Sequence, residues 1–565
     1  MKLKLIFLAL ITTLMFCGNV YAKKSAEKIA SEERDRQTTM KILLRTQYIL
    51  KQTPETTVLR TPTKEETGRG YVLFVCDYID RVYRNTVPKE KEIKNIINTF
   101  ATPGEYEPIT FAVYPLKDLG PVQVKVSDLT TADGSKISKE NIDIRKVSYL
   151  LKRTFPESKV CREVPQLLEK IDTVDILNGN TQEWWLTVKV PENAKAGIYK
   201  GKVTVNSEAK TTGELAISFE VLPFKLLSSQ ETGVWTGVYA YSDDNMQDLA
   251  DMREHGITGF NDFSISKTKN SFEDADRYME NLKKAGLKGP VYLYYGTEIA
   301  ISPEFKDRLS NLKNHLKSAN WPEVLIYPVD EPTAGTQATL DQCLIAMKTI
   351  KNIPGLKTYV TITNNTDPKL DLVLPYTDIG PYNPNRTKLL EALEKTKKAG
   401  KDFFWYNGLT RDNHPRRGRI LCGLWNWKLN AKGFTNWHYN ETQGDPFNDL
   451  DGAGMDAAFV YPSREQESGE HLEGIPTLIW ETMREGIDDR RYIETLKSYI
   501  TKANSSKDQN KIKAAAQAAK MLDEIFNSLP IFDKWENTEK WFLEIDADKV
   551  QGYRRQIADA IKNLH

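Results

Sequence analysis

The stretch EVLIYPVDEPTAG, residues 323–335, places two acidic side chains where a short apolar run ends. Its first half is rich in β-branched and aromatic residues, which favours a buried strand. Asp330 and Glu331 follow that run, and Pro332, which has no backbone N–H to donate, comes directly after them. We therefore expect the strand to end at or near Asp330. Successive side chains on a strand point to opposite faces, so this break would let both acids turn towards one cavity.

Helical and strand-like segments alternate on both sides of this stretch, over residues 228–475. Apolar residues recur with helical spacing and several of these helices stop at a glycine, as Met246, Leu249 and Met252 do before Gly256. Between the helices lie eight candidate strands: GVWTGVYAY, ITGFNDF, GPVYLYY, EVLIYPV, KTYVTIT, TDIGPY, DFFWYN and GFTNWHY. Eight such units predict a (β/α)8 TIM-type barrel, whose active site lies at the carboxyl ends of its strands. A doubly wound open sheet is the alternative, and the number of strands disfavours it.

Residues 93–227 show a different pattern, with period-two alternation in VQVKVSD, WWLTVKV and LAISFEV. Short alternating strands separated by turns predict a β-sandwich. We expect an N-terminal helical and loop arm over residues 23–92. Residues 476–565 are mostly helical in pattern and are expected to pack on the barrel. The chain is thus predicted to be multidomain.

The first 22 residues have the pattern of a secretory signal peptide. Lys2 and Lys4 precede the apolar run LIFLALITTLMF, and the small residue Ala22 precedes the mature chain. A lipid anchor at Cys17 is the alternative, which Phe16 disfavours because a small residue is wanted there. We therefore expect a secreted or periplasmic protein, and no later segment approaches the roughly 18 apolar residues of a membrane span.

Charge and cysteine content exclude several classes of partner. The chain has 78 basic and 77 acidic residues, so nothing in its charge indicates a nucleic-acid partner. Cys76, Cys161, Cys343 and Cys422 are far apart, lack metal-ligand spacing and do not form a disulfide framework, although one bridge stays open. The six histidines are scattered and there is no glycine-rich phosphate loop. We expect neither a metal nor a cofactor.

Two adjacent carboxylates suit glycoside hydrolysis, in which one acid donates a proton and the other stays charged. In the two-carboxylate mechanism the pair stands about 5 to 9.5 Å apart, which neighbouring residues in one cavity achieve only with difficulty. A route in which the 2-acetamido group of the substrate attacks needs only an acid and an adjacent stabilising carboxylate. An acid pair before a proline is also typical of a helix start, where it caps, and that interpretation stays open.

Aromatic and polar residues near the predicted strand ends are candidate sugar contacts, because aromatic faces stack on sugar C–H surfaces. Any one of them alone is more often a core residue, so their clustering carries the prediction. Tyr241 lies among the aromatic residues at these strand ends. The candidates for substrate binding are Tyr239, Tyr294, Tyr295, Asn383, Trp405, Tyr406, Asn407, Arg417, Trp427 and Trp437.

Several motifs give the chain a family resemblance. YPVDEP at 327–332, NWKLNAKGFTNWHYN at 426–440 and LIWETMREGIDDRRYIETL at 478–496 resemble the catalytic domain of glycoside hydrolase family 123. TPGEYEPITFAVYPLKDL at 102–119 and VPENAKAGIYKGKVTV at 190–205 are similar to the N-terminal β-sandwich of that family. The likeness is most specific at the Asp–Glu–Pro motif and at REGIDDRRY.

The resemblance implies an exo-acting β-N-acetylgalactosaminidase that retains configuration by substrate assistance. Its adjacent acid pair matches Asp330 and Glu331. Asp330 would orient the acetamido group and stabilise the oxazolinium ion, and Glu331 would be the general acid and then the base. The partner would be a glycan or glycoconjugate. The resemblance defines the reaction type more closely than the identity of the sugar.

Two alternatives remain from the sequence. In the first, Glu331 is the acid of a conventional two-carboxylate glycosidase and another strand-end acid, such as Glu298, is the nucleophile, although Glu298 equally fits a helix start or a solvated loop. In the second, the barrel has lost catalysis and binds glycans only. The natural glycan, its linkage and the oligomeric state stay open.

Overall fold

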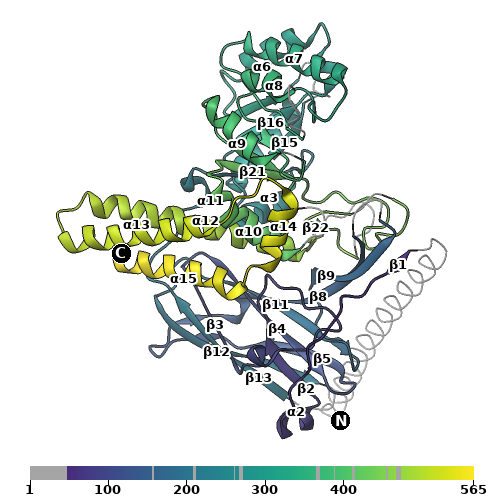
Figure 1. Ribbon diagram of the computed structural model, residues 1–565, viewed down its shortest axis with the longest axis vertical. Helices are drawn as coiled ribbons and strands as arrows, with labels where there is room; N and C mark the ends of the chain where they lie inside the picture. Colours follow the sequence, from purple (N-terminus) through teal and green to yellow (C-terminus); the bar gives the residue numbers. More distant parts are fainter. Residues whose placement is uncertain are drawn as a thin grey trace, which may run out of the picture. The chain divides into compact units, whose positions relative to one another are not determined.

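A computed structural model gives the fold of the chain (Figure 1). The structure describes residues 48–154, 158–207, 212–259, 261–265, 271–363, 369–386, 388–409, 414–453, 456–465 and 472–565. The predicted signal peptide, with Cys17, and residues 23–47 of the predicted arm lie outside the described residues. No helix within the described ranges is both long enough and apolar enough to cross a membrane.

The chain divides into two compact units, the smaller of which comprises Met1–Thr53, Leu150–Val164 and Gln443–Asp456. Within it, β1 (Ile49–Leu50) pairs in parallel with the first residues of β9 (Val160–Glu169). The buried carboxylate of Asp449 lies 3.2 Å from Lys152 Nζ and 3.3 Å from Arg153 Nε. These ion pairs tie together two segments that are far apart in the sequence.

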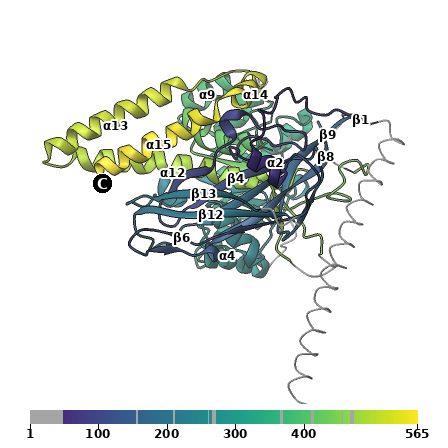
Figure 2. The same ribbon diagram turned by 90° about the horizontal axis from the view of Figure 1, so that it is seen from below.

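The larger unit contains two many-stranded sheets. Within this unit the first sheet has the order β9-β8-β11-β4-β2, with β2 (Tyr71–Val75), β4 (Tyr106–Pro115), β8 (Ile142–Arg153) and β11 (Gln182–Lys189). The second has the order β10-β5-β12-β13-β3, with β3 (Ile96–Ala101), β5 (Gly120–Val126), β10 (Val174–Ile176), β12 (Gly197–Ser207) and β13 (Thr212–Val221), and with β6 (Leu129–Thr130) and β7 (Lys136–Ile137) at its side. β12 and β13 run as a long antiparallel pair (Figure 2).

One hydrophobic cluster is shared by these two sheets. It includes Phe111 and Trp184 from the first sheet and Val203 and Ile217 from the second. Every second side chain of β13 is buried, as the period-two pattern of LAISFEV predicts. The sheet content of residues 93–227 is therefore the expected one.

The N-terminal boundary of this region differs from the expected one. Residues 71–75 fall inside the predicted arm, yet they form β2, which pairs antiparallel with β4. The sequence YVLFV is apolar throughout and its side chains are nearly all buried, so it has the composition of a central strand rather than of a solvated arm. Helix α2 (Lys64–Arg69) precedes β2 directly.

All eight candidate strands of the second half of the chain contain a strand. They are β14 (Trp235–Val238), β15 (Asn261–Ser264), β16 (Val291–Tyr294), β17 (Val324–Tyr327), β18 (Lys357–Thr358), β19 (Pro381–Tyr382), β20 (Phe404–Tyr406) and β21 (Gly433–Asn436). They form two four-stranded sheets, β15-β16-β17-β18 and β14-β21-β20-β19, in which every neighbouring pair is parallel.

The two parallel sheets also connect to each other at both of their edges. The backbone N–H of Thr258, ahead of β15, donates to the carbonyl of Thr236 in β14 at 3.0 Å. On the other side, parallel bridges join Tyr359 to Ile379 and Ile362 to Tyr382. The eight strands therefore form a curled sheet, whereas a doubly wound sheet would have two open edges.

Helices follow the strands in sequence, as expected. They are α3 (Met246–Glu254), α4 (Glu273–Ala285), α5 (Thr297–Ala300), α6 (Phe305–His315), α7 (Gln337–Lys351), α8 (Lys369–Val373), α9 (Leu389–Lys398), α10 (Pro415–Ile420), the π-helical turn η5 (Leu421–Trp425) and α11 (Asn426–Lys428). Gly286, at the end of α4, adopts a left-handed conformation with φ of 88°, which explains why the helix stops there. The four cysteines within the described ranges are free.

The chain ends in four helices: α12 (Leu478–Asn504), α13 (Gln509–Ser528), α14 (Trp535–Glu544) and α15 (Ala547–Leu564). Helices α12, α13 and α15 run side by side (Figures 1 and 2). The motif REGIDDRRY lies in α12, and its Glu485 and Asp489 bind Arg554 of α15 at 2.7 and 2.5 Å. Arg554 also lies 3.5 Å from Glu107 of β4, so this motif builds a buried ionic cluster that joins α12, α15 and the first sheet.

Candidate active site

The acid pair lies in the loop that follows β17 at its carboxyl end. The strand ends at Tyr327, three residues earlier than expected, because Pro328 has no N–H with which to continue the ladder. Asp330 is exposed and Glu331 is half-buried. Glu331 has φ of 40°, a left-handed conformation that is unfavourable for a residue with a side chain. Because the strand ends before the two acids, their side chains do not have to point in opposite directions.

Two hydroxyl groups hold Asp330. The hydroxyl of Tyr327 donates to Asp330 Oδ1, and Thr361 Oγ1 lies 3.2 Å from the same oxygen. Thr361 Oγ1 also accepts the backbone N–H of Glu331 at 3.1 Å and lies 2.8 Å from the hydroxyl of Tyr327. Thr361 is only 1% exposed. One buried threonine beyond β18 thus contacts the side chain of one acid and the backbone of the other.

Glu331 is held from a different strand. Tyr406, the last residue of β20, donates its hydroxyl to Glu331 Oε1 at 2.5 Å. Burial raises the pKa of Glu331 above its ordinary value, the hydrogen bond from Tyr406 lowers it, the charge of Asp330 raises it and that of Arg386 lowers it, with a net rise. A carboxyl group with a raised pKa is suited to donate a proton near neutral pH.

A cluster of aromatic residues lies beneath the acid pair. Tyr239, Tyr292, Tyr327 and Tyr359 are buried together, and Tyr294 and Trp437 pack against them. The hydroxyls of Tyr239 and Tyr359 lie 3.0 Å apart, and the rings of Tyr292 and Tyr359 stack at 4.5 Å. Burial raises the pKa values of Tyr239 and Tyr327, so both phenols stay protonated and able to donate. The predicted Tyr239, Tyr294 and Trp437 therefore belong to the same cluster as Tyr327, which binds Asp330.

Asn383 and Asn407 shape the loops after β19 and β20. Asn383 accepts the backbone N–H of Asn385 at its side-chain oxygen, and the carbonyl of Asn407 accepts the side-chain amide of Asn385 at 3.2 Å. Asn407 has φ of 59°. Both asparagines lie at strand ends as expected, where their contacts with Asn385 order the two loops.

The structure places Tyr295 and Trp405 in the core instead of the site. Tyr295 packs on Phe305, and Trp405 is 0% exposed and stacks on Phe434. Side chains alternate along a strand, so Trp405 must point towards the helices if Tyr406 points towards Glu331. The same alternation separates Tyr295 from its neighbour Tyr294.

Arg417 and Trp427 are also structural residues, which corrects their assignment as sugar contacts. Arg417 lies on α10, is 1% exposed and pairs with Glu539 of α14. Trp427 lies on α11 and packs on Phe526. Both residues are on helical turns between β20 and β21, whereas the sequence assigned them to loops at the strand ends.

Two residues of the site were missed from the sequence, Thr361 and Tyr327. Tyr327 stands three residues before Asp330, and alternation along a strand places residues at this odd spacing on opposite faces, so periodicity did not indicate it. Thr361 is 30 residues away from Glu331 in sequence and a lone threonine in a strand carries no signal. Backbone conformation gives a further sign of the site, because Tyr241, Ser242, Glu331 and Asn407 have positive φ values and all follow the ends of β14, β17 and β20.

Comparison of the sequence with known protein families assigns the chain to one of them. Residues 78–207 match the N-terminal domain of glycoside hydrolase 123, and residues 298–496 match the glycoside hydrolase 123 catalytic domain. Together these matches cover more than half of the chain, and the second contains both acids and the REGIDDRRY motif. The chain belongs to glycoside hydrolase family 123.

One solved structure agrees with this assignment at the level of the fold. A family 123 glycoside hydrolase from Clostridium perfringens, described in a study of glycolipid glycan hydrolysis, superposes with a TM-score of 0.66 at 15% identity, over 88% of this chain and 98% of that one. A family 39 glycoside hydrolase from Bacteroides cellulosilyticus covers 70% of this chain and 82% of its own at 10% identity, with a TM-score of only 0.34. No curated protein matches the sequence.

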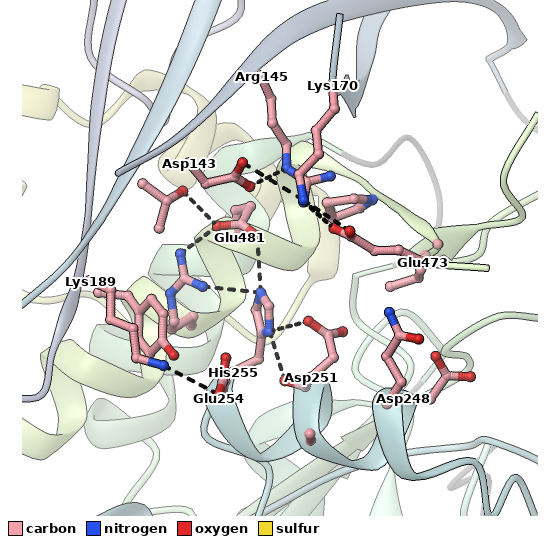
Figure 3. A pocket seen from close by; sticks show the side chains of 18 of the residues that line it. Asp143, Arg145, Lys170, Lys189, Asp248, Asp251, Glu254, His255, Glu473 and Glu481 are labelled. Carbon is pink, nitrogen blue, oxygen red and sulfur yellow. Dashed lines mark hydrogen bonds and ion pairs between the residues drawn. The ribbon is translucent and has the colours of Figure 1, made fainter. Parts of the chain in front are cut away.

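A separate cavity of about 560 Å³ is lined by many charged side chains (Figure 3). It is lined by residues of α3, α12 and the first sheet, among them His255, Glu481 and Lys189. Its charged side chains bind one another: His255 lies 3.1 Å from both Asp251 and Glu481, and Lys189 lies 3.5 Å from Glu254. Neither Asp330 nor Glu331 lines this cavity, so we do not place the reaction there.

Proposed function

We propose that this chain is a secreted exo-glycosidase that removes a terminal β-linked N-acetylhexosamine, specifically N-acetylgalactosamine, by a substrate-assisted retaining mechanism. Asp330 orients the acetamido group of the substrate and stabilises the oxazolinium ion. Glu331 protonates the leaving oxygen and afterwards activates water. Family 123 membership supports the reaction class.

The observation that carries this proposal is how the adjacent acids are held. Asp330 is bound by Tyr327 and Thr361, and Glu331 is bound by Tyr406 from another strand. Adjacent residues tied into one hydroxyl network leave little room for a sugar ring between them, as the two-carboxylate mechanism needs. They suit a reaction in which the substrate supplies the nucleophile. The raised pKa of Glu331 supports its role as the acid.

The architecture is part of the same proposal. The curled sheet with its alternating helices supports a (β/α)8 barrel over residues 228–475, and the shared core of the first two sheets supports a β-sandwich that extends back to residue 71. The contacts of α12 with α10 and η5 support C-terminal helices that pack on the barrel. The signal peptide remains a prediction, which N-terminal sequencing of the exported protein would test.

The Clostridium perfringens relative was studied for the hydrolysis of glycolipid glycans, which supports a glycoconjugate as the substrate class here. The alternative nucleophile, Glu298, is exposed and lies in the first turn of α5. That position fits a residue at a helix start, where a carboxylate is stabilised by the helix dipole.

A panel of aryl β-glycosides tests the proposal. The protein should hydrolyse aryl β-N-acetylgalactosaminide best, β-N-acetylglucosaminide less well, and β-galactoside and β-glucoside hardly at all. A thiazoline mimic of the oxazolinium ion should inhibit competitively. Efficient turnover of the galactoside would contradict the substrate-assisted mechanism, and a complete lack of turnover would favour a glycan-binding protein.

A further inference from the structure

Tyr241 is unusually exposed for an aromatic residue of this protein. The residue is 53% exposed, and no other aromatic residue within the described ranges is among the exposed large apolar residues. It stands three residues after β14, at the same end of the sheet as the acid pair. The ring of Tyr241 contacts that of His438, with 5.6 Å between the centroids, yet about half of the residue stays exposed. An exposed aromatic surface at the carboxyl end of a barrel-type strand points to a role in binding.

The structure holds this exposed ring in one place. Trp437 donates its indole N–H to the hydroxyl of Tyr241 at 2.6 Å. The buried carboxylate of Asp262 accepts the backbone N–H groups of Ala240 and Tyr241 at 2.8 and 3.1 Å. Both Tyr241 and Ser242 have positive φ values, of 46° and 64°. Backbone strain of this kind persists where surrounding contacts enforce it, and it is concentrated at functional sites.

The Tyr241–Trp437 pair is connected to the acid pair through neighbouring strands. Trp437 directly follows β21, which lies between β20, the strand of Tyr406, and β14, the strand that precedes Tyr241. Trp437 also packs on the aromatic cluster that contains Tyr327. The aromatic surface therefore continues from the residues that hold Asp330 and Glu331 outwards to the exposed ring of Tyr241.

We propose that Tyr241 and Trp437 form a leaving-group subsite that binds the sugar to which the terminal residue is attached. This inference rests on the proposed function, since it assumes that Glu331 protonates the oxygen between the two sugars. The terminal sugar lies over the acid pair, so the next sugar must lie towards solvent. There Tyr241 and Trp437 present an aromatic face. Such a face stacks on the C–H surface of a pyranose, while the indole N–H of Trp437 is satisfied by the hydroxyl of Tyr241.

Two substrates that differ only on the leaving side test this subsite. One is a disaccharide in which N-acetylgalactosamine is β-linked to galactose, and the other is β-N-acetylgalactosaminyl fluoride, which has no second sugar. Tyr241→Ala should lower kcat/KM for the disaccharide about tenfold, the effect of one lost aromatic contact, and should leave kcat/KM for the fluoride unchanged. Tyr241→Phe keeps the ring and should lose much less.

Leu177→Ala is the matched control, because Leu177 is 54% exposed and lies beside β10 of the second sheet; both substrates should be turned over at the wild-type rate. Equal losses on the two substrates with Tyr241→Ala would overturn the subsite, since the ring would then act on the terminal sugar or on folding. An unchanged rate on both would overturn it as well. If the wild-type protein turned over neither substrate, the proposed function would fail and the subsite with it.

Discussion

At the residue scale, one hydroxyl group organises both acids. Thr361 contacts the Asp330 carboxylate and the Glu331 backbone, while Tyr327 and Tyr406 each bind one of the two side chains. Each hydroxyl is brought by a different segment, so the geometry of the pair depends on how the curled sheet brings these segments together as well as on the local sequence. Predictions at this scale concern the separate roles of the two acids.

Substitution of each acid should give a different dependence on the leaving group. Glu331→Gln removes the proposed proton donor, so kcat/KM should fall about 10²- to 10⁴-fold for an alkyl leaving group and much less for dinitrophenol, which leaves without a proton. Asp330→Asn removes the charge that we propose stabilises the oxazolinium ion, so both substrates should be affected alike. Steady-state kinetics on the two substrates measures this, and a reversal of the two patterns would exchange the assigned roles.

The pH profile should report the hydrogen bond from Tyr406. In the proposed mechanism Glu331 must be protonated to act as the acid, so kcat/KM should decline on the alkaline side as Glu331 loses its proton. The bond from Tyr406 lowers the pKa of Glu331, so Tyr406→Phe should raise that pKa and move the alkaline decline to higher pH. Tyr382→Phe, which removes a hydroxyl bound to Thr396 instead, should leave the profile in place. A shift of the decline to lower pH in Tyr406→Phe would contradict this assignment.

At the element scale, periodicity predicted where the eight strands of the second half lie, but it missed β2 and the helical turns between β20 and β21. It also did not show which way every side chain faces. The eight strands and the helix that stops before Gly286 were predictable because these signals are local. Trp405 and Tyr406 are neighbouring aromatic residues, and only the folded sheet shows that the second of them faces the acids. Thr361 was not predictable, since its role comes from a contact between two loops.

The motif REGIDDRRY holds two helices together. Although it is one of the most specific family signatures in the sequence, it lies in α12, where its acids bind Arg554 of α15 rather than the substrate. A sequence motif alone does not distinguish a catalytic cluster from a buried ionic cluster, because both use the same residue types. The burial of the three charged groups decides between them.

Removal of Arg554 should be strongly destabilising. Arg554→Ala leaves Glu485, Asp489 and Glu107 as buried charges without their shared partner, a change that typically costs about 3–5 kcal/mol in the free energy of unfolding. The neighbouring Arg555 pairs with Glu220 near the surface, so Arg555→Ala should cost less than about 1 kcal/mol. Denaturant unfolding of the full-length variants compares the two, and equal losses would argue against a special role for the buried cluster.

At the scale of the whole molecule, stability should depend on the protonation of His255. Burial alone would lower the pKa of His255, but Asp251 and Glu481 outweigh burial and the nearby Arg484, so the pKa rises to about 9. A pKa above the ordinary 6.5 means that the charged form stabilises the fold. This stabilisation, about 3 kcal/mol, is complete below pH 6.5 and is lost as the pH rises through 9.

The variant His255→Gln isolates this contribution, because its side chain does not titrate. The wild-type protein should be the more stable of the two at pH 6, and the difference in unfolding midpoint should shrink towards pH 9. A difference that stays constant across this range would show that His255 is neutral in the folded protein.

The central claim is that the substrate supplies its own nucleophile to a site built from two adjacent acids. It is tested most directly by aryl β-N-acetylgalactosaminides whose N-acetyl group carries no, one, two or three fluorine atoms. Fluorine withdraws electrons from the amide oxygen, so kcat/KM should fall steeply with each added fluorine if that oxygen attacks the anomeric carbon. A rate that is independent of fluorination would contradict the account, because it would show that a group of the protein attacks instead.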